Sequence, residues 1–196
     1  DVDAWPSLVL LSDYFCTGDF QKTPSLHYYA ISDYSEVYQE NLRRALSGTG
    51  IVALHHTITL YAIERSRHLL NRQEYDHVLT MWEQMVSNKE ENLHPMKMFA
   101  DQPLPGFNQF FKVFRQRSPR LVLSLVNSAL GSESGRKKLK NYLIRSILNS
   151  YDGTYNPHYL TGLGASLWVI ETYHDTPIIV LNALWQYLDY FYAGTG

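Results

Sequence analysis

The longest apolar pattern in the chain covers residues 51–70, IVALHHTITLYAIERSRHLL. At about 100° per residue its apolar side chains point in nearly every direction, which is typical of a helix that other elements surround. The first part of this stretch, up to Ile63, contains only four polar side chains, His55, His56, Thr57 and Thr59. We therefore predict a buried central helix over residues 51–70.

Periodicity and capping signals predict further helices on both sides of this one. Asn156-Pro157 and Ser118-Pro119 each pair an N-cap residue with a proline at the first helical position. Three prolines between residues 92 and 106 predict an irregular crossing with one turn of helix, and glycines predict a loop over residues 131–135. The predicted helices cover residues 5–16, 33–47, 74–88, 107–114, 119–130, 137–150, 157–173 and 177–192.

The absence of strand-like alternation and of hairpin dipeptides gives the fold class. We predict an all-α fold in which the 196 residues form a single compact domain of about eight or nine helices around the central one. The chain begins at Asp1 and not at Met, which is consistent with a processed chain or a fragment.

Composition narrows the function classes. Apolar residues make up 45% of the chain and charged residues 18%, which excludes a disordered protein. The formal net charge of −2 gives no reason to expect nucleic acid as a partner, and no apolar run is long enough for a membrane span. Cys16 is the single cysteine, so an internal disulfide and a Cys-based metal cage are excluded. We expect a cytoplasmic location, because no signal sequence is present either.

Two adjacent histidines inside the predicted central helix are the strongest sign of chemistry. Burying His55 and His56 costs free energy unless each finds a hydrogen bond, a ligand or a metal. Neighbours on a helix point about 100° apart, so the two rings face different elements. One hypothesis is that one of them meets a substrate or a metal. The alternative is that each binds a backbone carbonyl or a tyrosine hydroxyl in the core.

A third histidine, His158, stands at the second position of the helix that Asn156-Pro157 starts. A helix N-terminus disfavours added positive charge, so this imidazole is predicted to stay neutral and to exchange protons. Gly162 and Gly164, one turn later, allow another backbone or a flat ligand to come close. The alternative is a loop-facing histidine over a tightly packed pair of helices.

A metal site is the main alternative chemistry. Glu171 and His174 have the i, i+3 spacing of carboxylate-bridged di-iron proteins. Such a site also needs a second Glu-x-x-His and two more inward carboxylates. Glu64 and His68 are four residues apart instead of three, and the long helices offer few other carboxylates among apolar neighbours. We therefore do not favour a metal, and keep a non-haem iron enzyme with these four ligands as an alternative.

Basic residues are concentrated between Lys112 and Arg145, which include nine of the seventeen in the chain and one acid, Glu133. This segment is either a phosphate-binding patch, for NADPH or another anion, or a solvated helix face. No GxGxxG or P-loop motif is present, so a nucleotide site would be unconventional.

The order of three motifs resembles that of the questin oxidase-like family. The first is the histidine-led segment His55 to Glu64, HHTITLYAIE, followed by a helix that carries Trp82. The second, His158 to Gly162 (HYLTG), is similar to the family's His-x-Val-Thr-Gly segment. The third is the closing helix, Leu184 to Tyr192, which ends in Ala-Gly. The resemblance covers about residues 34–194.

This resemblance implies an oxidoreductase, a monooxygenase that inserts oxygen next to an aromatic ketone of an anthraquinone-like polyketide, with NADPH as reductant. In such an enzyme His55 and His158 would polarise or deprotonate a phenol or ketone, with His56 as a third catalytic candidate. A phenolate formed in this way could react with oxygen without a metal. The candidates for contact with the substrate are Tyr61, Thr161, Trp82 and Trp168.

A third class stays open beside the oxidoreductase and the iron enzyme. It is a non-catalytic helical module that binds a lipophilic ligand or a partner through an exposed aromatic patch around residues 107–114.

Overall fold

The computed structural model describes residues 36–99, 101–151, 153 and 156–194. These residues form nine α-helices and two 3-10 turns, with no strand among them, which confirms the all-α prediction. None of the helices in this part of the chain has the length and apolar character needed to cross a bilayer. The predicted helix over residues 5–16 and the Asp33 cap lie outside the described residues.

The helices follow one another in the order α2 (Glu36–Ala45), α3 (Gly50–Ser66), α4 (Arg72–Ser87), α5 (Phe107–Phe114), α6 (Pro119–Leu123), α7 (Asn127–Leu130), α8 (Glu133–Asn149), α9 (Pro157–Thr172) and α10 (Pro177–Gly194). The 3-10 turns are Arg67–Leu69 and Met96–Met98.

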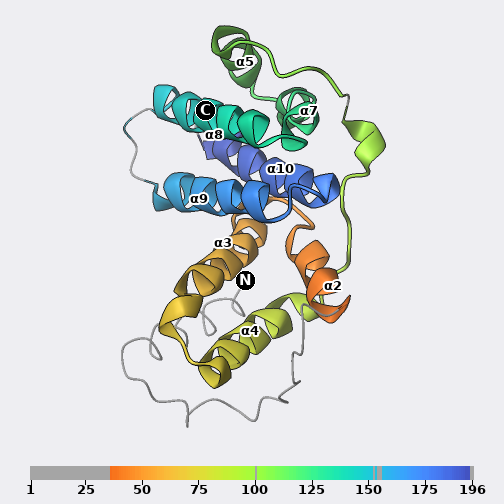
Figure 1. The fold of residues 1–196 in the computed structure, drawn as a ribbon, viewed down its shortest axis with the longest axis vertical. Coiled ribbons are helices and arrows are strands. Elements are labelled where there is room, and N and C mark those ends of the chain that lie inside the picture. The colour runs from red at the N-terminus through yellow and green to blue at the C-terminus, as the bar shows by residue number, and fades with distance from the viewer. Residues whose placement is uncertain (1–35, 100, 152, 154–155, 195–196) are drawn as a thin grey trace.

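Helices α9 and α10 lie side by side across the middle of the molecule, with α2, α3 and α4 on one side and α5, α7 and α8 on the other (Figure 1). Two helices, α3 and α10, lie at the centre of the fold. Eleven residues of α10 are buried, against seven of α3, and α10 contacts α3, α6, α7 and α9. The predicted central helix α3 is therefore one of two, and α10 is the more enclosed.

Buried polar side chains hold α3 in its place. Thr57 Oγ1 donates to Gln186 Oε1 of α10 at 2.7 Å, and Gln186 Nε2 donates to the carbonyl oxygen of Ala45 at 3.1 Å. Trp82 Nε1 of α4 donates to the carbonyl oxygen of His56 at 2.9 Å. Because each buried donor or acceptor needs a partner, these bonds favour one position of α3 against its neighbours.

The central helix ends earlier than the sequence pattern predicts. Helix α3 stops at Ser66, the chain continues as a 3-10 turn, and Leu69 is 74% exposed. Helix α4 begins at Arg72, two residues before the predicted start, because Asn71 forms a capping box with Glu74. The prediction of burial up to residue 70 is wrong at this end, where a polar run and a new N-cap replace the apolar pattern.

The predicted helix over residues 119–130 is interrupted. The carbonyl oxygen of Ser124 accepts a hydrogen bond from the backbone N–H of Gln102 at 2.9 Å, and residues 125 and 126 make i→i−3 bonds instead of α-helical ones. The segment is therefore two short helices, α6 and α7. Helix α8 also starts earlier than predicted, at Glu133, because Ser132 Oγ caps it by accepting from the backbone N–H of Gly135.

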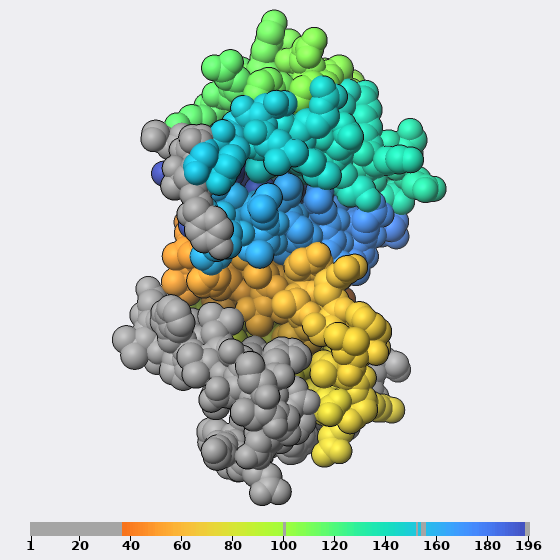
Figure 2. Space-filling model, turned by 90° about the vertical axis from the view of Figure 1, so that its left-hand side faces the viewer, coloured from red at the N-terminus to blue at the C-terminus, as the bar shows by residue number. Residues whose placement is uncertain are grey.

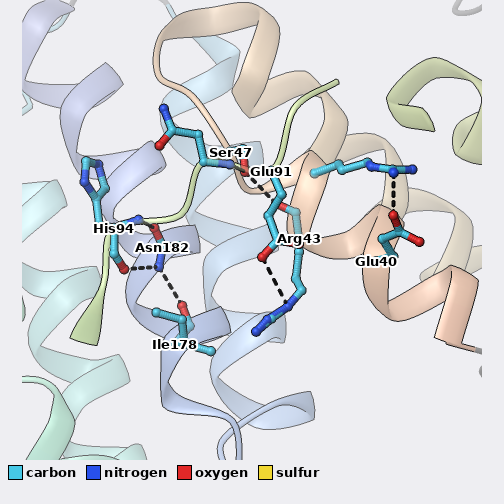
Figure 3. Close-up of polar contacts among 9 residues, drawn as sticks. Glu40, Arg43, Ser47, Glu91, His94, Ile178 and Asn182 are labelled. Atoms are coloured by element: carbon cyan, nitrogen blue, oxygen red, sulfur yellow. Dashed lines mark hydrogen bonds and ion pairs between the residues drawn. The ribbon is translucent and has the colours of Figure 1, made fainter. Parts of the chain in front are cut away.

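The irregular segment between α4 and α5 is held in place by hydrogen bonds from side chains of α10 and of the end of α2 (Figure 3). Asn182 Oδ1 accepts from the backbone N–H of His94 at 2.8 Å, and Asn182 Nδ2 donates to the His94 carbonyl at 3.2 Å and to that of Ile178 at 2.9 Å. Ser47 Oγ of the α2 end accepts from the backbone N–H of residue 92 at 2.8 Å. A segment with little helix of its own thus has its backbone polar groups satisfied by the helices around it.

Gly162 lets α9 pack closely against α10 and α3, as the sequence suggests, but the groups that approach it belong to this chain. A β-carbon at residue 162 would lie 2.8 Å from the ring of Tyr187 and 3.2 Å from the Leu54 side chain. Tyr187 is fully buried and its hydroxyl donates to the carbonyl of Tyr159, so the ring has no room to move. The close approach is therefore a packing feature of the core.

We expect Gly162→Ala to lower the free energy of unfolding by about 1–3 kcal/mol, because overpacking forces neighbouring side chains to shift. Gly164→Ala is the matched control, since a β-carbon there would be 3.4 Å from the Tyr61 ring, an ordinary contact. The control should be neutral or gain up to about 1 kcal/mol from helix propensity. Urea titrations of both variants measure the difference, and equal stabilities would contradict the packing argument.

Candidate functional site

The packing of α3 against α9 brings His55 and His158 together. Their Nε2 atoms are 2.9 Å apart, which is hydrogen-bond distance, and their ring centroids are 4.9 Å apart. Both side chains are half-buried. Figure 2 shows the band of α9 and α10 in blue directly bordering α3, which is orange to yellow. We name this pair of rings the histidine dyad.

Asn156, the N-cap of α9, determines which nitrogen of His158 carries a proton. Its Oδ1 accepts from the backbone N–H of His158 at 3.0 Å, and its Nδ2 donates to the hydroxyl of Tyr190 at 2.9 Å. Because a backbone N–H only donates, the atom of the Asn156 amide that faces it is the oxygen and not the nitrogen. The same oxygen lies 3.1 Å from His158 Nδ1. Since a carbonyl oxygen only accepts, Nδ1 of His158 must be the donor and carry a hydrogen.

This assignment fixes the direction of the bond within the dyad. When His158 is neutral, its Nε2 has a lone pair and accepts the N–H of His55 Nε2. Neutral His55 then has its own lone pair on Nδ1. That atom has no hydrogen-bond partner among the described residues, and it is not one of their fully buried unpartnered atoms. The dyad thus leaves His55 Nδ1 as a basic nitrogen on a half-buried side chain.

Electrostatics keep this base unprotonated. Burial lowers the pKa of His55, and repulsion from positive charge on the neighbouring His158 ring lowers that pKa further. At neutral pH His55 is therefore ready to accept a proton. The imidazolium that forms keeps its Nε2–H bond to His158, and a hydrogen bond from a charged donor is stronger than one from a neutral donor. The arrangement suits general base catalysis.

His56, the third catalytic candidate, is separate from the dyad. Its side chain is 5% exposed, and its pKa is lowered to about 4 by burial, by the positive charge of Lys89 and by His55. The ring is therefore a neutral core group. The sequence correctly indicated that the two adjacent rings face different surroundings, and the structure shows that it is His55 that meets His158.

The four candidates for substrate contact fall in different environments. Tyr61 and Trp168 are half-buried and adjacent, with ring centroids 6.0 Å apart, on the same two helices as the dyad. Thr161 is exposed and its hydroxyl donates to the carbonyl of Pro157. Trp82 is 0% exposed, which leaves no face for a ligand and gives it a role in the core instead.

The residues of the alternative iron site are not brought together. Glu64 Oε1 accepts a hydrogen bond from the hydroxyl of Tyr75 at 2.5 Å, and His68 is exposed. Glu171 forms ion pairs with Lys140 and Arg136. His174 Nδ1 donates to the backbone carbonyl of Glu171 at 2.8 Å. In the part of the chain that the structure describes, no three His, Cys, Asp or Glu residues could hold a metal ion.

Several side chains of the basic segment are engaged by groups of this chain. Arg136 and Lys140 are engaged by Glu171, and the Arg145 guanidinium lies 3.7 Å from the ring centroid of Phe107. The first turn of α8 carries an acid, Glu133, which a phosphate would avoid. Arg136, Lys140 and Arg145 are therefore already engaged within the fold.

Sequence reasoning missed two members of the site. The sequence pattern indicates Asn156 only as a helix cap, although an N-cap amide two residues before a histidine can also bind its ring. Tyr190 carried no signal, because nothing local connects it to a residue 34 positions earlier in the chain.

Comparison with known proteins adds nothing to these observations. No family model, no curated protein and no solved structure matches the chain. The similarity to questin oxidase-like proteins therefore rests on the three motifs alone.

Proposed function

We propose that the protein is an enzyme that binds a small, planar, hydroxylated aromatic compound beside the histidine dyad and removes a proton from it. The observation that carries the proposal is the 2.9 Å contact between the Nε2 atoms of His55 and His158, with Nδ1 of His158 held by Asn156. A structural histidine would bind a backbone carbonyl, whereas His55 binds a second imidazole and keeps a lone pair on Nδ1.

The proton-transfer step uses only groups of this chain. The phenolic O–H bond of the substrate breaks, its proton joins His55 Nδ1, and the electron pair stays on the oxygen as a phenolate. The new positive charge on His55 is stabilised by the bond to His158, whose Nδ1–H is in turn oriented by Asn156. Tyr61 and Trp168 offer aromatic faces along the same two helices for a flat substrate.

The oxidation that would follow rests on the resemblance to questin oxidase-like proteins. That resemblance implies oxygen insertion next to the ketone of an anthraquinone-like compound, with NADPH as the source of electrons. We derive no step that involves NADPH. The electron-rich phenolate is the species on which oxygen would act.

The test uses 2,6-dihydroxyanthraquinone, whose visible absorption moves to longer wavelength when a phenol ionises. Bound to the wild-type protein at a pH below the dye's own pKa, the dye should show about tenfold more phenolate than in buffer, which corresponds to one pH unit. His55→Gln should bind the dye without this increase. His68→Gln, an exposed histidine outside the dyad, should behave as wild type.

Two outcomes would overturn the proposal. One is a His55→Gln variant that ionises the bound dye as fully as wild type does. The other is the absence of any dye binding by the wild-type protein, measured by equilibrium dialysis.

A further inference from the structure

Positive charge is concentrated at one end of the molecule. Residues 107–150 carry nine basic side chains and one acidic one, a formal charge of +8 in a chain whose total is −2. Three of the helices that they form, α5, α7 and α8, lie together on one side of α9 and α10 (Figure 1). Residues 156–194, which include α9 and α10, contain no lysine or arginine. The small total charge therefore conceals a strong asymmetry, which is a sign of an anionic partner.

Two stripes of side chains, one on α5 and one on α8, meet at this end. Within each stripe the spacing is three or four residues, which places the members on one side of their helix. They are Phe107, Phe111 and Arg115 on α5 and its C-cap, and Lys138, Tyr142 and Arg145 on α8. The Arg145 guanidinium lies 3.7 Å from the ring centroid of Phe107, and the Tyr142 centroid is 5.3 Å from it. The two stripes are therefore one continuous surface, which we name the basic face.

The cations of the basic face are on the outside. Arg115, Lys138 and Arg145 are exposed. Lys138 Nζ is 5.5 Å from the Tyr142 ring centroid, and such contacts with rings, like that of Arg145, position a cation without neutralising its charge. The one acid of residues 107–150, Glu133, is in the first turn of α8, more than one turn before Lys138. The basic face is therefore a surface of positive potential.

Apolar groups accompany these cations. Phe107 and Phe111 are half-buried, and Leu148, three residues after Arg145 on α8, is 60% exposed. The other two rings of α5 are in the core, at 0% exposure for Phe110 and 1% for Phe114, so the prediction of an exposed aromatic patch around residues 107–114 is wrong for them. The basic face thus combines exposed cations with partly accessible apolar side chains.

This combination fits an anionic membrane surface better than a nucleic acid. A bilayer offers anionic headgroups above an apolar layer, and both cations and buried apolar area strengthen binding to it. Single-stranded nucleic acids bind instead by stacking bases on open aromatic faces. Phe111 is stacked on Phe107 and on Phe114, with ring centroids 5.7 Å and 6.5 Å apart, and Arg145 lies over Phe107. A base would have to displace these contacts.

We propose that the basic face docks the protein onto a membrane surface rich in anionic lipids. Arg115, Lys138 and Arg145 lie against the headgroups, and Leu148 enters the outer part of the acyl layer. The cation-free helices α9 and α10 do not compete with the basic face for the membrane, so the charge asymmetry also sets the orientation. This surface contains no residue of the histidine dyad, and the proposal does not depend on the function proposed for the dyad.

The test is cosedimentation of the full chain with vesicles of phosphatidylcholine alone and of phosphatidylcholine with about 30% phosphatidylserine. We expect at least about tenfold tighter binding to the anionic vesicles at about 0.1 M salt, and loss of this preference at about 1 M salt, where charges are screened within about 3 Å. Arg115→Gln/Lys138→Gln should bind the anionic vesicles about 30-fold more weakly, because each cation near such a surface contributes about fivefold. Arg65→Gln/Lys89→Gln removes two exposed cations outside the face and should bind as wild type does.

A second variant tests the apolar part of the contact. Leu148→Ser should bind the anionic vesicles about fivefold more weakly, because less apolar surface leaves water on docking. The side chain is exposed, so the substitution should not affect folding. Wild-type affinity of Leu148→Ser for the vesicles would contradict insertion into the acyl layer.

Three other results would overturn the proposal. The first is equal binding to neutral and anionic vesicles, and the second is wild-type affinity of Arg115→Gln/Lys138→Gln. The third is tighter binding to a duplex DNA oligonucleotide than to the anionic vesicles at the same salt, which would assign the basic face to nucleic acid. His55→Gln should bind vesicles as wild type does, so failure of the dyad and failure of this surface are distinguishable.

Discussion

Replacing Trp82 with alanine is expected to lower the free energy of unfolding by about 3–5 kcal/mol, the range for removing a large aromatic side chain from a core. Trp82 is 0% exposed and packs against Tyr38, with ring centroids 6.0 Å apart. Its Nε1 donates to the carbonyl oxygen of His56, so the variant loses a buried hydrogen bond as well as packing. Natural domains are stable by only about 5–15 kcal/mol, so a loss of this size removes a large part of the free energy of unfolding. It is the largest single effect on stability that we expect.

Two comparisons separate packing from hydrogen bonding. Trp82→Phe keeps most of the ring and loses the donor, so it should cost about 1–2 kcal/mol, and it remains measurable if the alanine variant does not fold. Trp168→Ala removes a half-buried ring and should cost less than Trp82→Ala. Urea titration measures the free energy of unfolding of all three variants. Equal losses for Trp168→Ala and Trp82→Ala would contradict the expectation that Trp82 contributes more to the core than Trp168 does.

Acid is expected to destabilise the protein through His56 as pH falls from about 6.5 to about 4. The pKa of His56 is lowered to about 4 in the folded chain, whereas an unfolded histidine titrates near 6.5. Within this window the unfolded chain binds a proton that the folded chain does not, so stability decreases as pH falls. At 1.36 kcal/mol per pH unit, the loss from this one side chain reaches about 3 kcal/mol near pH 4.

The measurement is the free energy of unfolding at several pH values for wild type and His56→Gln. Carboxyl groups contribute to the pH dependence of both proteins, so the informative quantity is the difference between the two curves. That difference should change by about 3 kcal/mol between pH 7 and pH 4 and be flat above pH 7. His68→Gln, at an exposed position, should follow the wild-type curve. Parallel curves for wild type and His56→Gln would contradict the expectation.

Helix boundaries were predictable where local chemistry sets them. The α5 helix covers residues 107–114 as predicted, and α9 begins at Pro157 because the Asn156 side chain accepts from the backbone two residues later. The break between α6 and α7 was not predictable, because it depends on a bond from Gln102 to Ser124. That bond joins positions far apart in the sequence, and no local pattern signals it.

The candidate site was predictable as two separate residues but not as a dyad. His55 and His158 each stood out by position, one in an apolar helix and one at a helix N-terminus. Their contact joins residues 103 positions apart, so it required the packing of α3 on α9. The same packing left His56 in the interior.

The amino-acid sequence alone determined the helical class, most helix starts and the presence of buried imidazoles. These properties depend on side-chain periodicity and on capping groups within a few residues of each other. Tertiary structure brought His55 next to His158, placed Trp82 in the core and paired Glu171 with Lys140. Those outcomes depend on which faces of distant helices pack together, and helix packing is set by the shapes of whole surfaces.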